Sequence, residues 1–106
     1  MKKRLRLRLE PEASEELRAA VKWYEERRAG LGTEFLAEVN SVLERIRQFP
    51  GIGAFAPSVP KGLGVRTTPV GRFPYSVAFL EQEGLIRVIA IAHSRRRPGY
   101  WRYRLQ

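Results

Sequence analysis

The sequence contains no cysteine and only one histidine, His93. The lack of cysteine excludes disulfide frameworks, thiol catalysis and cysteine-based zinc sites, and it suits a reducing compartment. The acidic residues between positions 10 and 44 fall mostly at solvent-facing positions of predicted helices, and no two converge as a catalytic or metal-binding pair. We therefore expect neither a metal ion nor a cofactor.

Long apolar runs are also missing. No stretch approaches the roughly 18 to 20 apolar residues that a membrane-spanning helix needs. The N-terminus, Met1–Arg4, is basic, but alternating charges follow it where a signal peptide has an apolar core. The sequence has no glycine-rich phosphate-binding loop and no nucleophile elbow. These absences predict a cytoplasmic protein without membrane contact or nucleotide-dependent chemistry.

Acidic residues are absent from the C-terminal end, whereas the whole chain of 106 residues carries a net charge of +9. Residues 1–9 and residues 94–106 each carry +5, while residues 10–50 carry −3. Sixteen of the 20 basic residues are arginine, whose planar guanidinium binds phosphate or carboxylate through paired hydrogen bonds. Arginine-rich codon usage would give the same bias. The C-terminal third is therefore predicted to bind a polyanion or an acidic partner.

The hydrophobic pattern predicts a single α+β domain over residues 1–106. Leucine alternates with arginine in residues 4–9, which is typical of a half-buried strand. Apolar residues then recur at helical spacing in residues 11–28 and, after Thr33 as the expected N-cap, up to Pro50. The Gly30–Gly32 break between them predicts a helical hairpin.

The period changes to two in the second half of the chain. Strands are expected at residues 65–70, 73–80 and 85–92. The Gly/Pro-rich stretch of residues 50–64 is expected to be a loop that packs down through Ile52, Phe55 and Val59. The predicted order is βααβββ, with the helical hairpin packed on one face of a four-stranded, mostly antiparallel sheet.

Several short stretches, in this order, resemble the RelE/ParE toxin superfamily of type II toxin–antitoxin systems, and the ParE-like plasmid-stabilisation branch in particular. They are Gly30-Leu31-Gly32 with Phe35, Pro50, Arg72-Phe73-Pro74-Tyr75, and Ile89-Ala90-Ile91-Ala92-His93 followed by Arg96, Pro98, Tyr100, Trp101 and Arg102. The resemblance implies a toxin that a cognate antitoxin neutralises. One branch of the superfamily cuts ribosome-bound mRNA and another poisons DNA gyrase, and the resemblance leaves both targets open.

His93 is the candidate for proton transfer if the chain cuts RNA. A metal-independent, ribosome-dependent endoribonuclease needs a general acid for the leaving oxygen and cations for the charge that develops on phosphorus. His93 fits the first role, and Arg66, Arg72 and Arg96 fit the second, with Arg66 and Arg72 approaching His93 from neighbouring strands. A histidine that only ends a strand and hydrogen-bonds to backbone is the alternative.

The remaining arginines and tyrosines of the C-terminal segment are candidates for binding. The candidates for binding mRNA or acidic residues of the antitoxin are Arg95, Arg97, Tyr100, Arg102 and Arg104. The arginines are expected to alternate along a strand-like tail. Single-strand binding proteins interleave aromatic and basic residues in this way. Trp101 is expected in the core, at the sheet edge against the helical hairpin. A non-catalytic basic binding module, or a toxin relic without activity, remains the alternative function.

Overall fold

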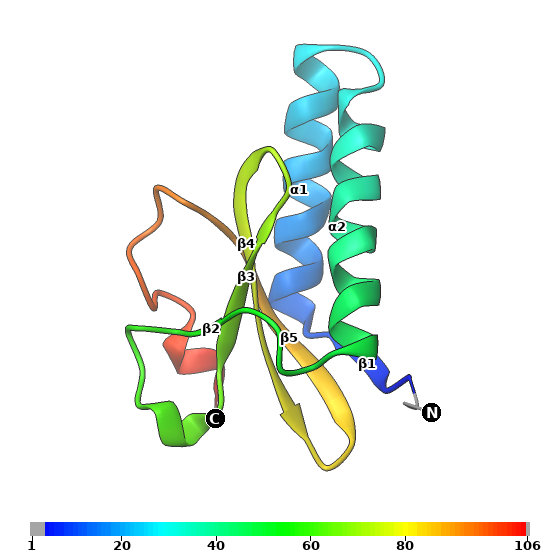
Figure 1. Cartoon of the computed structure of the whole chain (residues 1–106). Coiled ribbons are helices and arrows are strands. Elements are labelled where there is room, and N and C mark those ends of the chain that lie inside the picture. The colour runs from blue at the N-terminus through cyan, green and yellow to red at the C-terminus, as the bar shows by residue number, and fades with distance from the viewer. Residues whose placement is uncertain (1–3, 106) are drawn as a thin grey trace.

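The computed structural model describes residues 4–105 as a helical hairpin packed on a five-stranded sheet (Figure 1). The elements are β1 (Arg6–Leu9), α1 (Pro11–Arg27), α2 (Leu31–Gln48), β2 (Ala54–Phe55), β3 (Arg66–Val70), β4 (Phe73–Gln82) and β5 (Leu85–His93), with short 3₁₀ turns η1 (Lys61–Leu63) and η2 (Arg102–Leu105). The α+β class with a helical hairpin is confirmed. Lys2 and Lys3 of the basic N-terminus lie outside the described residues.

The strand order is β1-β5-β4-β3-β2, and only the β1–β5 pair is parallel among the pairs of the described sheet. The prediction of four strands was wrong by one. Ala54 and Phe55, in the stretch expected to be a loop, pair antiparallel with Thr67 and Arg66 and form the edge strand β2. A two-residue strand is too short for sequence periodicity to indicate it.

The start of α2 differs from the sequence prediction. Thr33 was the expected N-cap, but the helix begins at Leu31, and Gly30 precedes it in the left-handed region with φ of 90°. The first N–H groups are satisfied by α1: the Glu25 carboxylate accepts from the backbone N–H of Gly30 at 2.8 Å and of Gly32 at 3.0 Å. An anion at a helix N-terminus satisfies orphan donors and opposes the helix dipole. The cap therefore comes from the preceding helix.

The main core lies between the helices and the sheet. Ala13, Ala20 and Tyr24 of α1 meet Phe35, Val39, Val42 and Ile46 of α2 over Val77, Phe79, Ile86, Val88 and Ile91 of the sheet. Leu5, Leu7 and Leu9 pack against this cluster, as their alternation predicted. Gly32 permits the close approach of the helices, since a Cβ there would lie 2.5 Å from the Val21 carbonyl oxygen.

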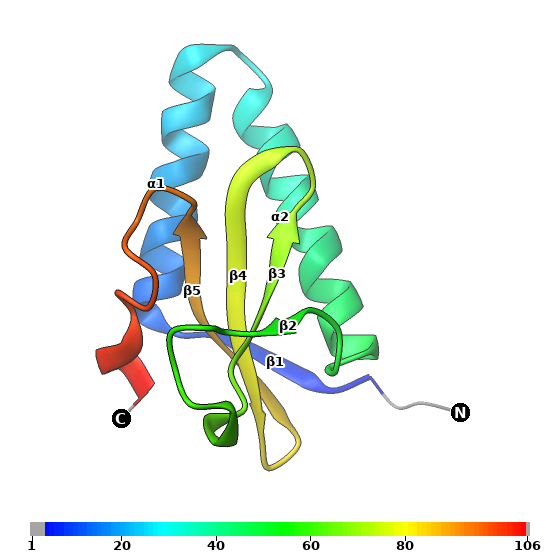
Figure 2. The ribbon, with the colours of Figure 1, turned by 60° about the vertical axis from the view of Figure 1, so that its left-hand side comes forward.

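A second, smaller core covers the opposite face of the sheet. Trp101, only 4% exposed, packs there with Ala56, Val59, Val65, Ala78, Ile89 and Ala90. Figure 2 shows the loop after β2 in front of the sheet on this side, and the C-terminal segment along the β5 edge, where it passes beside α1. The prediction that Trp101 is core is confirmed, but its position against the helical hairpin was wrong. Ile52 and Val59 pack down as expected, whereas Phe55 stays 39% exposed.

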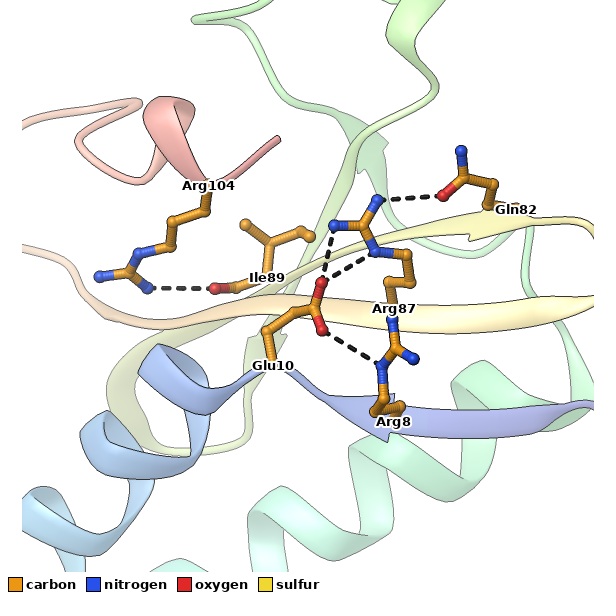
Figure 3. Close-up of polar contacts among 6 residues, drawn as sticks. All are labelled: Arg8, Glu10, Gln82, Arg87, Ile89 and Arg104. Atoms are coloured by element: carbon orange, nitrogen blue, oxygen red, sulfur yellow. Dashed lines mark hydrogen bonds and ion pairs between the residues drawn. The ribbon is translucent and has the colours of Figure 1, made fainter. Parts of the chain in front are cut away.

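An ion pair joins the start of α1 to β5 (Figure 3). Glu10 accepts from Arg87 Nε at 2.9 Å and Nη2 at 2.6 Å, and its second oxygen accepts from Arg8 Nε at 3.2 Å. The Glu10 and Arg87 side chains are only 13% and 14% exposed, so water screens their attraction weakly. The backbone N–H of Glu10 also donates to the Val88 carbonyl at 3.0 Å. Together these contacts fix the point where β1 ends and α1 departs.

Within residues 4–105, the helices are too short or too polar to cross a membrane.

Candidate functional site

A groove of about 940 Å³ lies between α1, the start of β4 and the end of β5. Its apolar lining includes Ala19, Ala20 and Trp23 of α1, with Pro74 and Ile91 from the sheet. Its polar lining is Glu16, His93, Ser94, Arg95, Arg96 and Tyr100, with Tyr24 and Tyr75 beside them. The sequence motif that ends β5 therefore forms one wall, and α1 forms the other.

His93, the last residue of β5, is held by a hydrogen bond that limits its chemistry. Its Nδ1 accepts from the backbone N–H of Arg95 at 3.0 Å, and its ring meets the edge of the Tyr75 ring at 5.0 Å between centroids. An acceptor nitrogen carries no proton, so this bond assigns the neutral ring's proton to Nε2. An imidazolium would lose the bond to Arg95. The geometry thus matches the strand-ending histidine that bonds to backbone, and the catalytic role of His93 stays a prediction.

Glu16 accepts several of the hydrogen bonds in the groove, and the sequence pattern did not identify it as a site residue. Its carboxylate accepts from the Tyr100 hydroxyl in a short hydrogen bond, from Arg104 Nη1 and Nη2 at 3.0 Å each, and from the backbone N–H of Ile91 at 3.0 Å. Glu16 lies three residues after Ala13 and four before Ala20, so it borders the buried stripe of α1. That position was the signal that distinguishes it from the solvent-facing acids.

A bulge in β5 explains why these side chains meet the strand. The β4–β5 register shifts between Ala78 and Phe79, which face Ala90 and Val88, so Ile89 is an extra residue. The pairing of β1 with β5 ends at Leu9 and Val88, and no strand within residues 4–105 covers this edge of β5 after Val88. Arg104 Nη1 donates to the Ile89 carbonyl at 3.0 Å, and Glu16 accepts from Ile91. The two side chains supply the hydrogen bonds that a neighbouring strand would otherwise provide.

Arg104 and Tyr100 are therefore tied to the protein itself. The Arg104 side chain is 7% exposed, and η2, which carries it, is a 3₁₀ turn rather than the strand-like tail expected. Burial alone lowers the pKa of Arg104, but hydrogen bonds to Glu16 and Tyr103 outweigh it and raise the pKa. Burial, reinforced by the hydrogen bond to Glu16, raises the pKa of Tyr100. The sequence analysis expected both side chains to be free to bind mRNA or the antitoxin, but both are largely buried and bonded to Glu16.

Four of the predicted site residues share the groove: His93, Arg95, Arg96 and Tyr100. The Arg96 guanidinium stacks 3.8 Å from the centroid of the Tyr100 ring, whose hydroxyl is bound to Glu16. A stacked guanidinium keeps its edge N–H groups available for a carboxylate or phosphate. Arg95 and Arg96 are exposed, so the groove has a basic rim above an apolar floor.

Arg66 and Arg72 do not line this groove. Arg66 faces Phe79 across the ladder, four residues along β4 from the Tyr75 that faces His93, and its guanidinium packs 4.2 Å from the Phe55 ring centroid. Arg72 is bonded to Glu34 of α2, and this hydrogen bond lowers the pKa of Glu34. The prediction that both arginines approach His93 was wrong. The register of β3 places Arg66 beside a part of β4 that does not face His93, and the Arg72 side chain points toward α2.

Arg97 and Arg102 are exposed on either side of Gly99 and also lie outside the groove. Trp23 is a groove residue that sequence reasoning missed. It is 49% exposed, and Arg27, one helical turn later, packs 3.9 Å from its ring centroid. The sequence did contain a signal for Trp23, because this tryptophan lies beside the apolar stripe of α1 rather than within it, a position that favours partial exposure.

The family model described as ParE toxin of type II toxin–antitoxin system, parDE, matches residues 7–98. The chain therefore belongs to the ParE toxin family, and the resemblance in its sequence is confirmed.

A solved structure supports the same fold. A chain of the "Chromosomal ParDE TA system from P. aeruginosa" superimposes with a TM-score of 0.72 at 23% identity, covering 84% of this chain and 95% of that chain. No curated protein matches this sequence.

Proposed function

We propose that this protein is a toxin that acts in the cytoplasm by binding and inhibiting DNA gyrase, without cutting mRNA, and that a cognate antitoxin neutralises it. The observation that carries the choice of target is the hydrogen bond from the Arg95 backbone N–H to His93 Nδ1. This bond occupies one ring nitrogen of the only histidine in the sequence, and it supports binding rather than proton transfer as the role of the groove.

The other groups of the groove support inhibition by binding. RNA cleavage needs an acid, a base and cations around one phosphate. Glu16, the only carboxylate that lines the groove among the described residues, is already bound to Arg104 and Tyr100. Arg66 and Arg72, expected to stabilise the phosphate, lie elsewhere. An exposed basic rim over an apolar floor is suited to a protein partner instead.

The same groove is our proposed site for the antitoxin. Ala19 and Ala20 leave space beside Trp23 for apolar side chains, while Arg95 and Arg96 attract acidic ones. An acidic amphipathic segment matches both features. The similar solved structure comes from a ParDE toxin–antitoxin system, which supports a pairing of this kind for the present chain.

Expression without an antitoxin tests the target. We expect growth arrest with cleaved DNA–gyrase complexes and inhibited supercoiling by purified gyrase, and intact mRNA in a purified ribosome reaction. Arg96→Ala should weaken inhibition, while Arg45→Ala, an exposed arginine of α2, serves as the matched control.

His93→Asn separates binding from catalysis. An asparagine amide oxygen can accept the Arg95 N–H but cannot transfer a proton at neutral pH. The variant should keep full inhibition of gyrase if His93 only ends the strand. Cleavage of ribosome-bound mRNA by the unmodified protein, and its loss in His93→Asn, would show that the proposed function is wrong.

A further inference from the structure

Two segments far apart in sequence form one layer over the sheet face opposite the helices. Residues 56–65 and 94–105, here named the basic layer, meet through Val59, Trp101 and Leu105 of the second core. Gly99 packs against Ser58, since a Cβ on Gly99 would lie 2.8 Å from the Ser58 hydroxyl oxygen. Figure 1 shows this layer on one side of the sheet and both helices on the other.

The basic layer contains no acidic residue. Residues 45–106 hold eleven of the basic residues and only two acids, Glu81 and Glu83 near the β4–β5 turn, whereas residues 1–44 are neutral overall. Eight of the eleven acids lie on α1 and α2. Divided by element, the helical hairpin of residues 11–48 carries −2, residues 1–10 carry +4 and residues 49–106 carry +7, so the positive charge lies outside the helices. Such an asymmetric charge creates a directional field that attracts anions.

Three cations of this layer lie within three residues, along the chain, of the contact between Ser58 and Gly99. Lys61 follows Ser58 by three residues, and Arg97 and Arg102 lie on either side of Gly99. All three are exposed, and none joins an ion pair with any of residues 4–105. Arg104, by contrast, forms an ion pair with Glu16. These three side chains are separate from the groove proposed for gyrase and the antitoxin.

We propose that the basic layer binds the phosphate backbone of duplex DNA. Lys and Arg side chains neutralise phosphates in protein–DNA complexes, and the layer has no acidic residue that would oppose such contacts. Single-strand binders present open aromatic faces for base stacking. Here Trp101 is buried and the Tyr100 ring carries the Arg96 guanidinium, so Tyr103, which is 62% exposed, is the one aromatic ring of the layer that is open to a base. A single open ring cannot stack successive bases, whereas the layer holds several exposed cations, which favours the backbone of a duplex.

Fluorescence anisotropy with a labelled 20-base-pair DNA duplex tests this inference. The logarithm of the binding constant should fall with the logarithm of salt concentration by about 0.9 per phosphate contact. In the triple variant Lys61→Glu/Arg97→Glu/Arg102→Glu we expect that slope to decrease by about 2.7, with affinity at least about 100-fold lower at low salt.

The matched control is Arg6→Glu/Lys22→Glu/Arg45→Glu, which reverses three exposed cations of β1, α1 and α2. Both triples lower the net charge from +9 to +3, so they differ only in which face is changed. In the control variant, the salt slope should differ from that of the unmodified protein by no more than about 0.9, the value for one phosphate contact. Circular dichroism and thermal melting of all three proteins establish that they are folded.

Several outcomes overturn the proposal. Equal losses in the two triples would show that net charge alone attracts DNA. Binding of poly-L-glutamate as tightly as the duplex would assign the layer to an acidic protein, and tighter binding of a single-stranded oligonucleotide would exclude the duplex. The assay contains no gyrase, so its result is independent of the proposed target.

Discussion

Glu16 shows how much a single carboxylate does in this protein. One side chain of α1 joins the C-terminal segment, through Arg104 and Tyr100, to the backbone of β5 at Ile91. The Arg104 and Glu16 side chains are 7% and 17% exposed, so removal of one charge leaves the other poorly solvated.

Glu16→Gln is therefore expected to lower the free energy of unfolding by about 3 kcal/mol, because a buried ion pair is broken on one side only. Urea denaturation measures the change. Glu15→Gln is the control on the next residue, since the Glu15–Arg18 pair is exposed at 72% and 69% and should contribute about 0.5 kcal/mol or less. Similar losses in both variants would contradict the role given to Glu16.

Tyr100 makes stability depend on alkaline pH. Burial and the hydrogen bond to Glu16 raise the pKa of Tyr100 above the ordinary value of about 10, so the folded protein holds the phenol proton more tightly than the unfolded chain does. Its contribution to stability is complete below about pH 10 and is lost as pH rises from there toward the folded-state pKa. Burial also raises the pKa of Tyr24 and Tyr75, which contribute in the same direction.

Tyr100→Phe isolates the contribution of one phenol. Thermal melting of both proteins between pH 8 and 11 should show a shallower alkaline loss in the variant. Tyr103→Phe, at a side chain that is 62% exposed, should leave the pH profile unchanged. A parallel profile for Tyr100→Phe and the unmodified protein would show that Tyr100 does not take part in this linkage.

At the scale of the element, α2 depends on α1 for its first turn. Glu25 occupies the position that an N-cap side chain would normally fill, while the predicted cap, Thr33, is an exposed residue inside the helix. The separation of seven residues between Glu25 and Gly32 exceeds the local patterns of helix capping.

Glu25→Ala should destabilise the protein by about 1 kcal/mol, the usual loss for a removed helix cap. Thr33→Ala, within the helix, should change stability by less than about 0.5 kcal/mol. Chemical denaturation of the two single variants makes the comparison. A larger effect at Thr33 than at Glu25 would restore Thr33 as the cap of α2.

At the scale of the whole molecule, the sheet is stabilised from both faces. The helical hairpin covers one face, and the C-terminal segment with the loop after β2 covers the other. The buried Trp101 is the largest side chain of the second core. The segment that carries the proposed binding residues is thus also part of the folded core.

Trp101→Ala should cost about 3–5 kcal/mol of unfolding free energy, a large part of the roughly 5–15 kcal/mol typical of a small domain. Trp23→Ala, at the exposed tryptophan, should cost about 1 kcal/mol or less. Thermal melts of the two variants provide the test. A small loss at Trp101 would mean that the second core contributes little to the fold.

Features that depend on neighbours along the chain could be predicted from the amino-acid sequence alone. Leucine alternation predicted β1, helical spacing predicted α1 and α2, and the count of charges located the basic C-terminal segment. Local periodicity and composition encode these features, because each element must bury one face wherever it finally packs. The ordered short motifs also carried the family resemblance that the family model confirmed.

The partners of the polar residues, by contrast, depend on how the chain folds in three dimensions. Glu16 and Arg104 are 88 residues apart, and their contact depends on the bulge at Ile89 and on the end of β1 at Leu9. Sheet register likewise separated Arg66 from His93, although the two had been expected to approach each other across the ladder. The sequence gives the charge and type of each residue. Three-dimensional packing determines which arginine forms an ion pair with an internal carboxylate and which remains exposed to a ligand.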